Sequence, residues 1–216
     1  MLIIQKNKNL AWAHFGIALC ELKLGAVVAA IKKLEHTITL SRHFLSAYDL
    51  LADAQESLDN LEAAQAAMIS VLEVSPRSFE RALRLAQIST QLEDWSTAEN
   101  GYSRLLRLTR DTSHEQVEYY YDYLKCLTNM MAVGSDNSKL ADKFKRTLIR
   151  LRSFGKTNPS ALSNSFRIEI QQYLTRDHLG EAVKSWKQWN RLIKSGQASP
   201  LSDAQKHTLK KRLGLL

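Results

Sequence analysis

Three alanines, Ala30, Ala64 and Ala98, recur along this chain at intervals of 34 residues. A second set keeps the same interval one helix earlier and consists of Ala18, Ala52 and Ala86. A side chain as small as alanine lets two helices cross closely, and the larger apolar residues around it fill the remaining space. A repeat of this length indicates stacked helical pairs, in which each unit buries its apolar face against the next.

The spacing of apolar residues predicts two helices in each of the first three units. These predicted helices span residues 10–24 and 27–40, 45–58 and 61–74, and 78–92 and 95–109. The turns inside each unit are only a few residues long, so the two helices of a pair must run antiparallel.

The repeat loses its register after Arg110, although helical patterns continue. Near the C-terminus, Ser202 and Gln205 have the spacing of a capping box at the start of a last helix. The pattern divides the chain into five parts. An N-terminal extension (1–9) precedes three regular units (10–110), and these are followed by a degenerate fourth unit (111–154), a fifth unit (155–195) and a capping helix (200–216). The predicted fold is an all-α, right-handed α-solenoid of about five helix pairs plus the capping helix.

The net charge of +8 is unevenly distributed along the sequence. Residues 1–136 hold 13 Lys/Arg against 17 Asp/Glu, whereas residues 137–216 hold 17 Lys/Arg against 5 Asp/Glu, a balance of +12. Such asymmetry is found in proteins that bind nucleic acid or acidic partners, but a solvated helical exterior has the same composition. Both readings stay open at this point.

No motif in the sequence predicts catalysis, and we expect no cofactor, no metal and no enzymatic activity. Glycines are too scattered for a phosphate-binding loop, and the six histidines lack partners at metal-ligand spacing. Asp49, Asp53 and Glu56 share one helix face, which is compatible with acid–base chemistry but is better explained as an acidic surface stripe. Both Cys20 and Cys126 lie in apolar helical patterns, so we predict buried, reduced thiols and a cytoplasmic protein.

Four tyrosines fall within five residues, at 119, 120, 121 and 123. A helix cannot turn all four toward its core. We expect Tyr119, Tyr120 and Tyr123 to pack and Tyr121 to present its ring to solvent. An exposed aromatic ring can anchor a binding partner, although it can also be exposed incidentally.

The segment from Trp12 to Pro76, continuing to Arg110, resembles the tetratricopeptide repeat. More narrowly, residues 45–52, 75–78 and 110–123 resemble the output region of bacterial response regulators that join a receiver domain to such repeats. No strand bearing a phosphoacceptor precedes Leu10, so this resemblance implies a fragment of a longer chain or an orphan member of that group. It implies a non-catalytic module for protein–protein interaction in bacterial signal transduction.

In tetratricopeptide domains the first helix of each unit lines a concave groove that holds a partner peptide. We call the matching positions here the predicted groove: Trp12, Phe15, Leu19, Leu22, Lys23, Asp49, Asp53, Glu56, Leu83, Gln87, Arg167 and Gln171. Asp49 and Asp53 stand where chaperone-binding members have part of their Lys/Asn carboxylate clamp, which argues against a chaperone-tail ligand. The resemblance implies a protein or peptide partner, a receiver domain or other signalling protein among them. No apolar run in the sequence approaches the ~20 residues needed to span a bilayer, so we expect no membrane association.

The apolar N-terminal end of the predicted groove leaves three occupants open. Residues 1–8 or an absent receiver domain could cover it, a second copy could pair with it through Trp12 and Phe15, or a foreign segment could bind there. The alternative function is nucleic-acid binding by a helical-repeat protein through the basic C-terminal half. The residues for that role would be Arg150, Arg152, Lys184, Lys187 and Lys194.

Overall fold

The computed structural model describes residues 10–133 and 138–215, and all regular secondary structure within them is helical. The chain divides into two compact units, residues 1–110 (unit 1) and residues 111–216 (unit 2). In the described residues no helix is long and apolar enough to cross a membrane.

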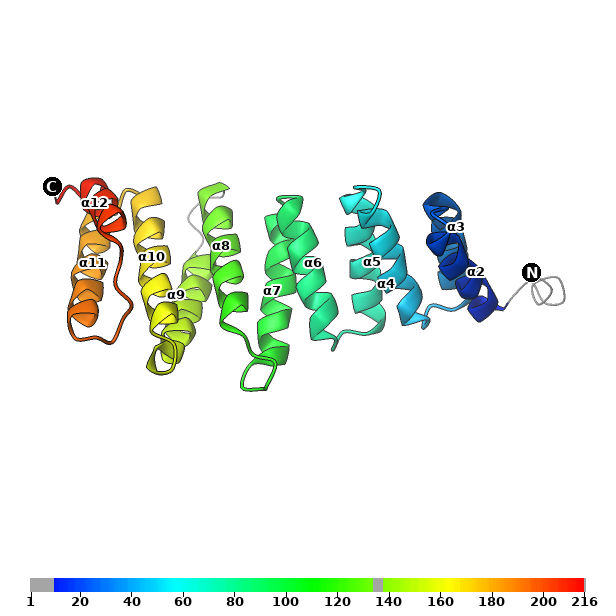
Figure 1. The fold of residues 1–216 in the computed structure, drawn as a ribbon, viewed down its shortest axis with the longest axis horizontal. Helices are drawn as coiled ribbons and strands as arrows, with labels where there is room; N and C mark the ends of the chain where they lie inside the picture. Colours follow the sequence, from blue (N-terminus) through cyan, green and yellow to red (C-terminus); the bar gives the residue numbers. More distant parts are fainter. Residues whose placement is uncertain (1–9, 134–137, 216) are drawn as a thin grey trace. The chain divides into compact units, whose positions relative to one another are not determined.

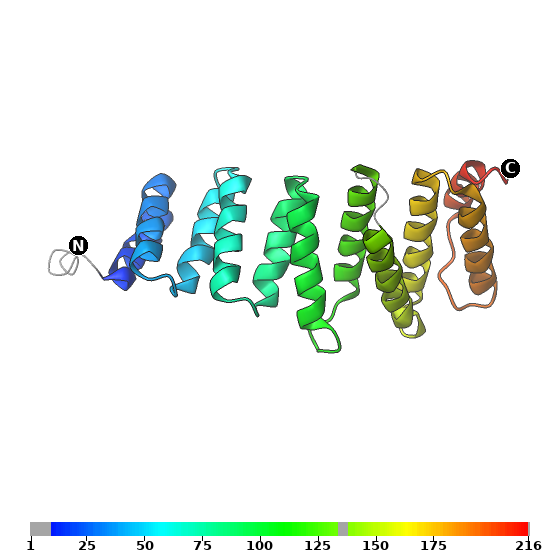
Figure 2. The ribbon, with the colours of Figure 1, turned by 180° about the vertical axis from the view of Figure 1, so that it is seen from behind.

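Unit 1 consists of three antiparallel helix pairs stacked in chain order (Figure 1). Their bounds are α2 Ala11–Lys23 and α3 Val27–Leu40, α4 Leu45–Glu56 and α5 Leu61–Val74, and α6 Phe79–Gln91 and α7 Trp95–Thr109. Between the pairs of this unit, α3 also packs on α4 and α5 on α6. Within this unit, the second helices are in front in the view from behind (Figure 2).

Unit 2 contains two further pairs, a short 3₁₀ turn and a single last helix. Its elements are α8 Val117–Val133, α9 Ser138–Ser153, η1 Phe154–Lys156, α10 Pro159–Thr175, α11 Leu179–Lys194 and α12 Asp203–Arg212. The predicted capping box is confirmed, because the Ser202 hydroxyl accepts from the Gln205 N–H at 3.3 Å and the Gln205 side chain accepts from the Ser202 N–H at 3.1 Å. The predicted all-α fold of stacked helix pairs is confirmed.

The repeated alanines of unit 1 are buried between its helices. Ala30, Ala64 and Ala98 are each 0% exposed. In the third pair, Gly101 of α7 comes so close to α6 that an added Cβ atom would lie 2.9 Å from the Cβ of Ala86. Real Cβ atoms do not approach this closely, so the crossing excludes any residue larger than glycine at this position.

Two other sequence expectations have different outcomes. Tyr119, Tyr120 and Tyr123 are buried as predicted, and Tyr121 is half-buried. Cys126 is buried, but the prediction for Cys20 is wrong because this thiol is exposed. The repeat counterparts of Cys20, Ala54 and Ile88, are buried within the stack, whereas no described helix covers the corresponding side of α2.

We predict that Ala64→Leu overpacks the crossing of α4 and α5 and lowers the free energy of unfolding by about 1–3 kcal/mol. Ala66→Leu is the matched control, because Ala66 is exposed on the same helix, and it should change stability by less than about 0.5 kcal/mol. Urea denaturation followed by circular dichroism measures both. Equal effects of the two substitutions would mean that α5 tolerates the larger side chain at its crossing.

Candidate functional site

The acidic part of the predicted groove is neutralised inside unit 1. Arg81 of α6 donates to both carboxylate oxygens of Asp49, at 2.8 and 2.7 Å. Arg84 lies 2.5 Å from the nearest oxygen of Asp53 and 2.7 Å from that of Glu56. Hydrogen bonding to Asp49 is the main cause of a raised pKa at Arg81. The carboxylates on α4 therefore hold the next helix pair and leave little negative charge for a ligand.

The apolar end of the predicted groove is partly core. Phe15 is half-buried and its ring centroid lies 4.8 Å from that of Phe44, and Leu22 packs against the same core cluster. Trp12 and Leu19 differ, because 55% and 38% of their surfaces are exposed. Only Trp12 and Leu19 of this group therefore present large apolar surface to solvent.

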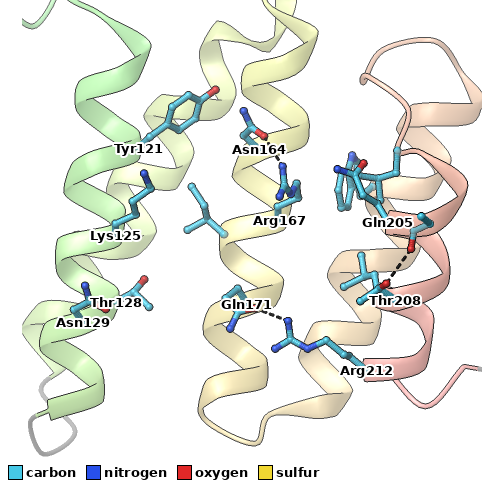
Figure 3. A pocket seen from close by; sticks show the side chains of 15 residues that line it. Tyr121, Lys125, Thr128, Asn129, Asn164, Arg167, Gln171, Gln205, Thr208 and Arg212 are labelled. Carbon is cyan, nitrogen blue, oxygen red and sulfur yellow. Dashed lines mark hydrogen bonds between the residues drawn. The ribbon is translucent and has the colours of Figure 1, made fainter.

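Unit 2 contains a cleft of about 790 Å³, which we call the unit 2 cleft. Three helices form its walls: α8, α10 and α12 (Figure 3). Its lining consists of Tyr121, Lys125, Thr128, Asn129, Asn164, Arg167, Ile168, Gln171, Trp189, Leu201, Ala204, Gln205, Thr208, Leu209 and Arg212. Arg167 and Gln171 belong to the predicted groove, and α12 corresponds to the predicted capping helix.

The walls of the unit 2 cleft are polar because each helix turns one stripe of side chains toward it. On α8 the stripe includes Tyr121, Lys125 and Asn129, which are spaced one helical turn apart. On α10, Arg167 lies 3.5 Å from the Asn164 amide oxygen, and across the cleft Arg212 donates to the Gln171 oxygen at 2.9 Å. The second of these contacts ties α12 to α10 at one end of the cleft.

An apolar cluster at the base of the cleft and a chain of hydrogen bonds beside it hold the cleft in shape. Trp189 is fully buried and stacks on Phe166 with ring centroids 6.3 Å apart. Its indole N–H donates to the Ser163 hydroxyl, which in turn donates to the Ser199 carbonyl at 2.9 Å. Leu201, Leu209 and Leu213 pack into the same cluster, and they fix α12 beside α10.

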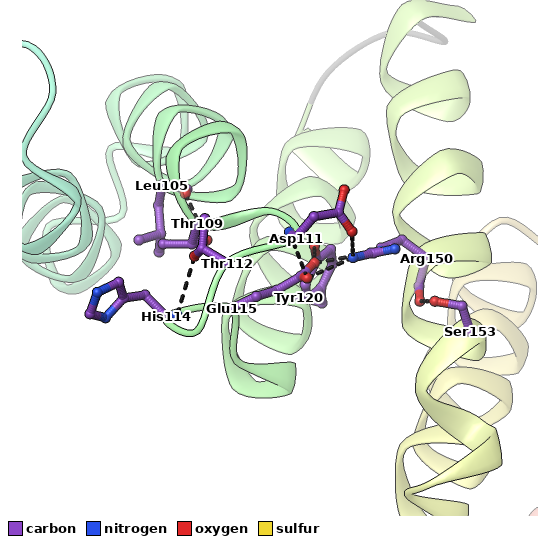
Figure 4. Close-up of polar contacts among 9 residues, drawn as sticks. All are labelled: Leu105, Thr109, Asp111, Thr112, His114, Glu115, Tyr120, Arg150 and Ser153. Atoms are coloured by element: carbon purple, nitrogen blue, oxygen red, sulfur yellow. Dashed lines mark hydrogen bonds and ion pairs between the residues drawn. The ribbon is translucent and has the colours of Figure 1, made fainter.

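A partly buried ionic cluster positions the start of α8 (Figure 4). Arg150 of α9 donates to both oxygens of Glu115, at 3.0 and 2.6 Å, and to Asp111 at 2.6 Å. Tyr120 donates to the same Glu115 carboxylate. A neighbouring arginine, Arg152, donates to Glu169 at 2.7 Å and lies over the Phe166 ring, 4.2 Å from its centroid. Helices α8, α9 and α10 are therefore tied together by arginines of α9.

The cluster shifts the protonation of its members. Burial opposes ionisation of Glu115, but hydrogen bonds from Arg150, Tyr120 and the Asp111 N–H outweigh it and lower its pKa. Burial and the bond to Glu115 raise the pKa of Tyr120 to about 12. Bonding to Glu115 also raises the pKa of Arg150, so this guanidinium stays charged. None of these groups lines the unit 2 cleft, so we assign the cluster a structural role.

We predict that Glu115→Gln lowers stability by about 1–3 kcal/mol at pH 7. A carboxylate whose folded pKa is depressed stabilises the fold above its unfolded pKa, about 4.3 for Glu, and loses this effect as the pH falls through the folded value. The difference between wild type and variant should therefore shrink below about pH 4. Urea denaturation at pH 7, 5 and 3.5 measures it. A difference independent of pH would show that Glu115 acts through packing instead of charge.

The cations proposed for nucleic-acid binding have mixed surroundings. Arg150 and Arg152 are committed to the ion pairs described above, and Lys184 pairs with Glu181 at 2.8 Å. Lys187 and Lys194 are exposed on α11. In the described part of the chain, no group of three or more His, Cys, Asp or Glu side chains could hold a metal ion.

Comparison with known proteins identifies the fold. No protein-family model matches the sequence, and no curated protein is significantly similar to it. The crystal structure of YrrB, described as a TPR protein with an unusual peptide-binding site, is similar with a TM-score of 0.55 and 13% identity, over 90% of this chain and 96% of YrrB. A crystal structure of MamA is similar with a TM-score of 0.51 and 14% identity, over 72% of this chain and 81% of MamA. The chain therefore has the fold of tetratricopeptide-repeat proteins.

Proposed function

We propose that this protein is a non-catalytic scaffold that binds a peptide segment of another protein in the unit 2 cleft. The observation that carries this proposal is the presence of four side-chain amides on the three walls of the cleft: Asn129, Asn164, Gln171 and Gln205. Each amide has N–H donors that can pair with the carbonyls of a peptide backbone whatever its sequence. The amide oxygens of Asn164, Gln171 and Gln205 accept hydrogen bonds from Arg167, Arg212 and the Ser202 N–H. The reported peptide-binding site of YrrB, which has the same fold, supports this proposal.

The shape of the cleft suits an extended peptide. It is open along its length between α8, α10 and α12, and its volume of about 790 Å³ falls within the usual range for ligand sites. The amides on α10 lie seven residues apart, which corresponds to about 10 Å along the helix axis. An extended peptide covers this distance in about three residues, so two amides can hold one short segment.

We predict that Asn164→Ala combined with Gln171→Ala abolishes the capture of peptides from a phage-displayed random nonapeptide library. Both substitutions remove amides that face the cleft and leave the buried side of α10 unchanged. The matched control is Gln188→Ala, because Gln188 is an exposed amide of α11 outside the cleft. Sequencing of the retained phage and fluorescence anisotropy with the enriched peptides give the readout. A wild-type chain that enriches no peptide would refute the proposed function.

A role in bacterial signal transduction is part of the same proposal. The resemblance of residues 45–52, 75–78 and 110–123 to receiver-linked output regions supports a place in bacterial cytoplasmic signalling, with a receiver domain as the partner. Binding of a purified receiver domain from the same organism, with and without phosphorylation by acetyl phosphate, is the direct test. If neither form binds, the signalling role fails while peptide binding in the cleft is unaffected.

The N-terminal apolar surface supports a second contact, self-association through Trp12. We predict that Trp12→Ala shifts a dimer toward monomer in sedimentation-velocity experiments and leaves the helix content unchanged. Phe15 is left intact because it packs in the core. Leu58→Ala is the control, since Leu58 is also exposed, at 47%, but lies in the turn of the second pair. A wild-type chain that sediments as a monomer at all concentrations would exclude this contact.

A further inference from the structure

The charge of the unit 2 cleft indicates which peptides it selects. Each of its three walls contributes one cation: Lys125 from α8, Arg167 from α10 and Arg212 from α12. Among the described residues that line the cleft none is Asp or Glu, although Lys125 lies 3.6 Å from the carboxylate of Asp122, which is outside the lining. A concave site that contains one sign of charge concentrates ligands of the opposite sign. The cleft is therefore matched to a negatively charged ligand.

The two cleft arginines also differ from the arginines that hold the fold together. Arg81, Arg150 and Arg152 each have a carboxylate oxygen within 2.7 Å. In contrast, the hydrogen bonds of Arg167 and Arg212 go to amide oxygens, at 3.5 and 2.9 Å. A guanidinium can pair with a carboxylate through two parallel N–H···O bonds between opposite charges, whereas an amide oxygen offers one neutral acceptor atom. An incoming carboxylate would thus displace the amide and gain affinity.

The positions of these amides set the spacing of the ligand charges. Asn164 and Gln171, which hold the two guanidinium groups, lie seven residues apart on α10. Seven residues of α-helix rise about 10.5 Å. An extended peptide advances about 3.3 Å per residue, so two carboxylates at this separation are three positions apart. Side chains three positions apart point to opposite sides of an extended chain, which suits arginines that come from two different helices, α10 and α12. Ile168, Leu201 and Leu209 lie in the lining as well and suit apolar side chains in the same segment.

We propose that the unit 2 cleft selects acidic peptide segments in which two carboxylates three positions apart pair with Arg167 and Arg212. This inference rests on the proposed peptide-binding function and adds the chemistry of its ligand. The released amides of Asn164 and Gln171 then pair with the backbone between the two acidic residues. Lys125 on the opposite wall attracts the same segment as it approaches.

The test uses the full chain and peptides from the random nonapeptide library. The enriched sequences should contain Asp or Glu at positions i and i+3 with apolar residues nearby. The tightest peptide is then synthesised with blocked ends, together with a twin in which both acidic residues are replaced by their amides. We expect the twin to bind about 10- to 100-fold more weakly at 150 mM salt, because both charge pairs are lost. Equal affinities would overturn the inference.

Variants of the chain separate the ligand chemistry from the peptide-binding function. Arg167→Gln should weaken binding of the acidic peptide about threefold to tenfold while leaving the affinity of the amide twin unchanged. Arg212→Gln should weaken the acidic peptide by a similar factor and the amide twin to a smaller extent, because Arg212 also holds α12 against α10. Lys187→Gln removes an exposed cation outside the cleft and should change neither affinity. Arg167→Glu should shift the library selection toward Lys or Arg at the matching position. If peptides are enriched without acidic pairs, the charge selection fails and the peptide-binding function stands.

A last arm tests whether the cleft recognises a peptide or only negative charge. A single-stranded dT12 oligonucleotide is added as a competitor at 150 mM salt. An acidic peptide that is held by backbone amides and apolar contacts should resist this competitor, because phosphate contacts weaken steeply with salt. Complete displacement at equimolar concentration would overturn the inference in favour of a polyanion site.

Discussion

The close crossing of two helices at small residues is the constraint on which the rest of unit 1 depends. Ala30, Ala64 and Ala98 are all fully buried, and Gly101 marks a contact where even a methyl group would clash. Two helices can approach this closely only where their small residues face each other. The crossing therefore fixes how the first helix of each pair in unit 1 is rotated about its own axis. With this rotation, the carboxylates of α4 face Arg81 and Arg84 of α6, and these ion pairs join neighbouring helix pairs.

The charges of the chain are divided between holding the fold and facing solvent. Arg81 and Arg84 neutralise the carboxylates of α4, while Arg150 and Arg152 hold the first three helices of unit 2 together. The balance of +12 in residues 137–216 therefore overstates the charge available to a ligand. The arginines left without a described carboxylate partner in the unit 2 cleft matter more than the total, because a partner can reach them at little desolvation cost.

Much of the fold could be predicted from the sequence because its signals are local and periodic. The helix bounds follow from apolar spacing, and the three buried tyrosines follow from the helical turn. The pairing of Asp49 with Arg81 could not be predicted, because it joins residues 32 apart whose rotamers depend on packing. The exposure of Cys20 was missed for a related reason: periodicity reports an apolar face but not whether a neighbour covers it.

The turns show a compromise that sequence periodicity alone does not reveal. Gly25, Asp59 and Glu93 occur at the 34-residue interval, and all have positive φ, at 76°, 58° and 55°. In each case the N–H of the following residue donates to the carbonyl five positions back, which closes the first helix in the same way. Only the first turn uses glycine, so the second and third accept the strain of a left-handed residue with a side chain. The three turns therefore share the same backbone conformation although the residue at the positive-φ position differs between them.

The third wall of the unit 2 cleft is α12, a single helix that is not part of a helix pair. This affects the affinity of the cleft for a ligand. No residue within α12 is buried, and its attachment depends on Leu209, Leu213 and the hydrogen bond from Arg212 to Gln171. An element with so few buried contacts opens locally at a lower free energy than the pairs around it. A ligand that contacts Arg212 binds only when α12 is docked, so binding must also stabilise that docking. The affinity of the cleft is thus coupled to the order of the last helix, and substitutions at Leu213 should weaken binding without touching the ligand.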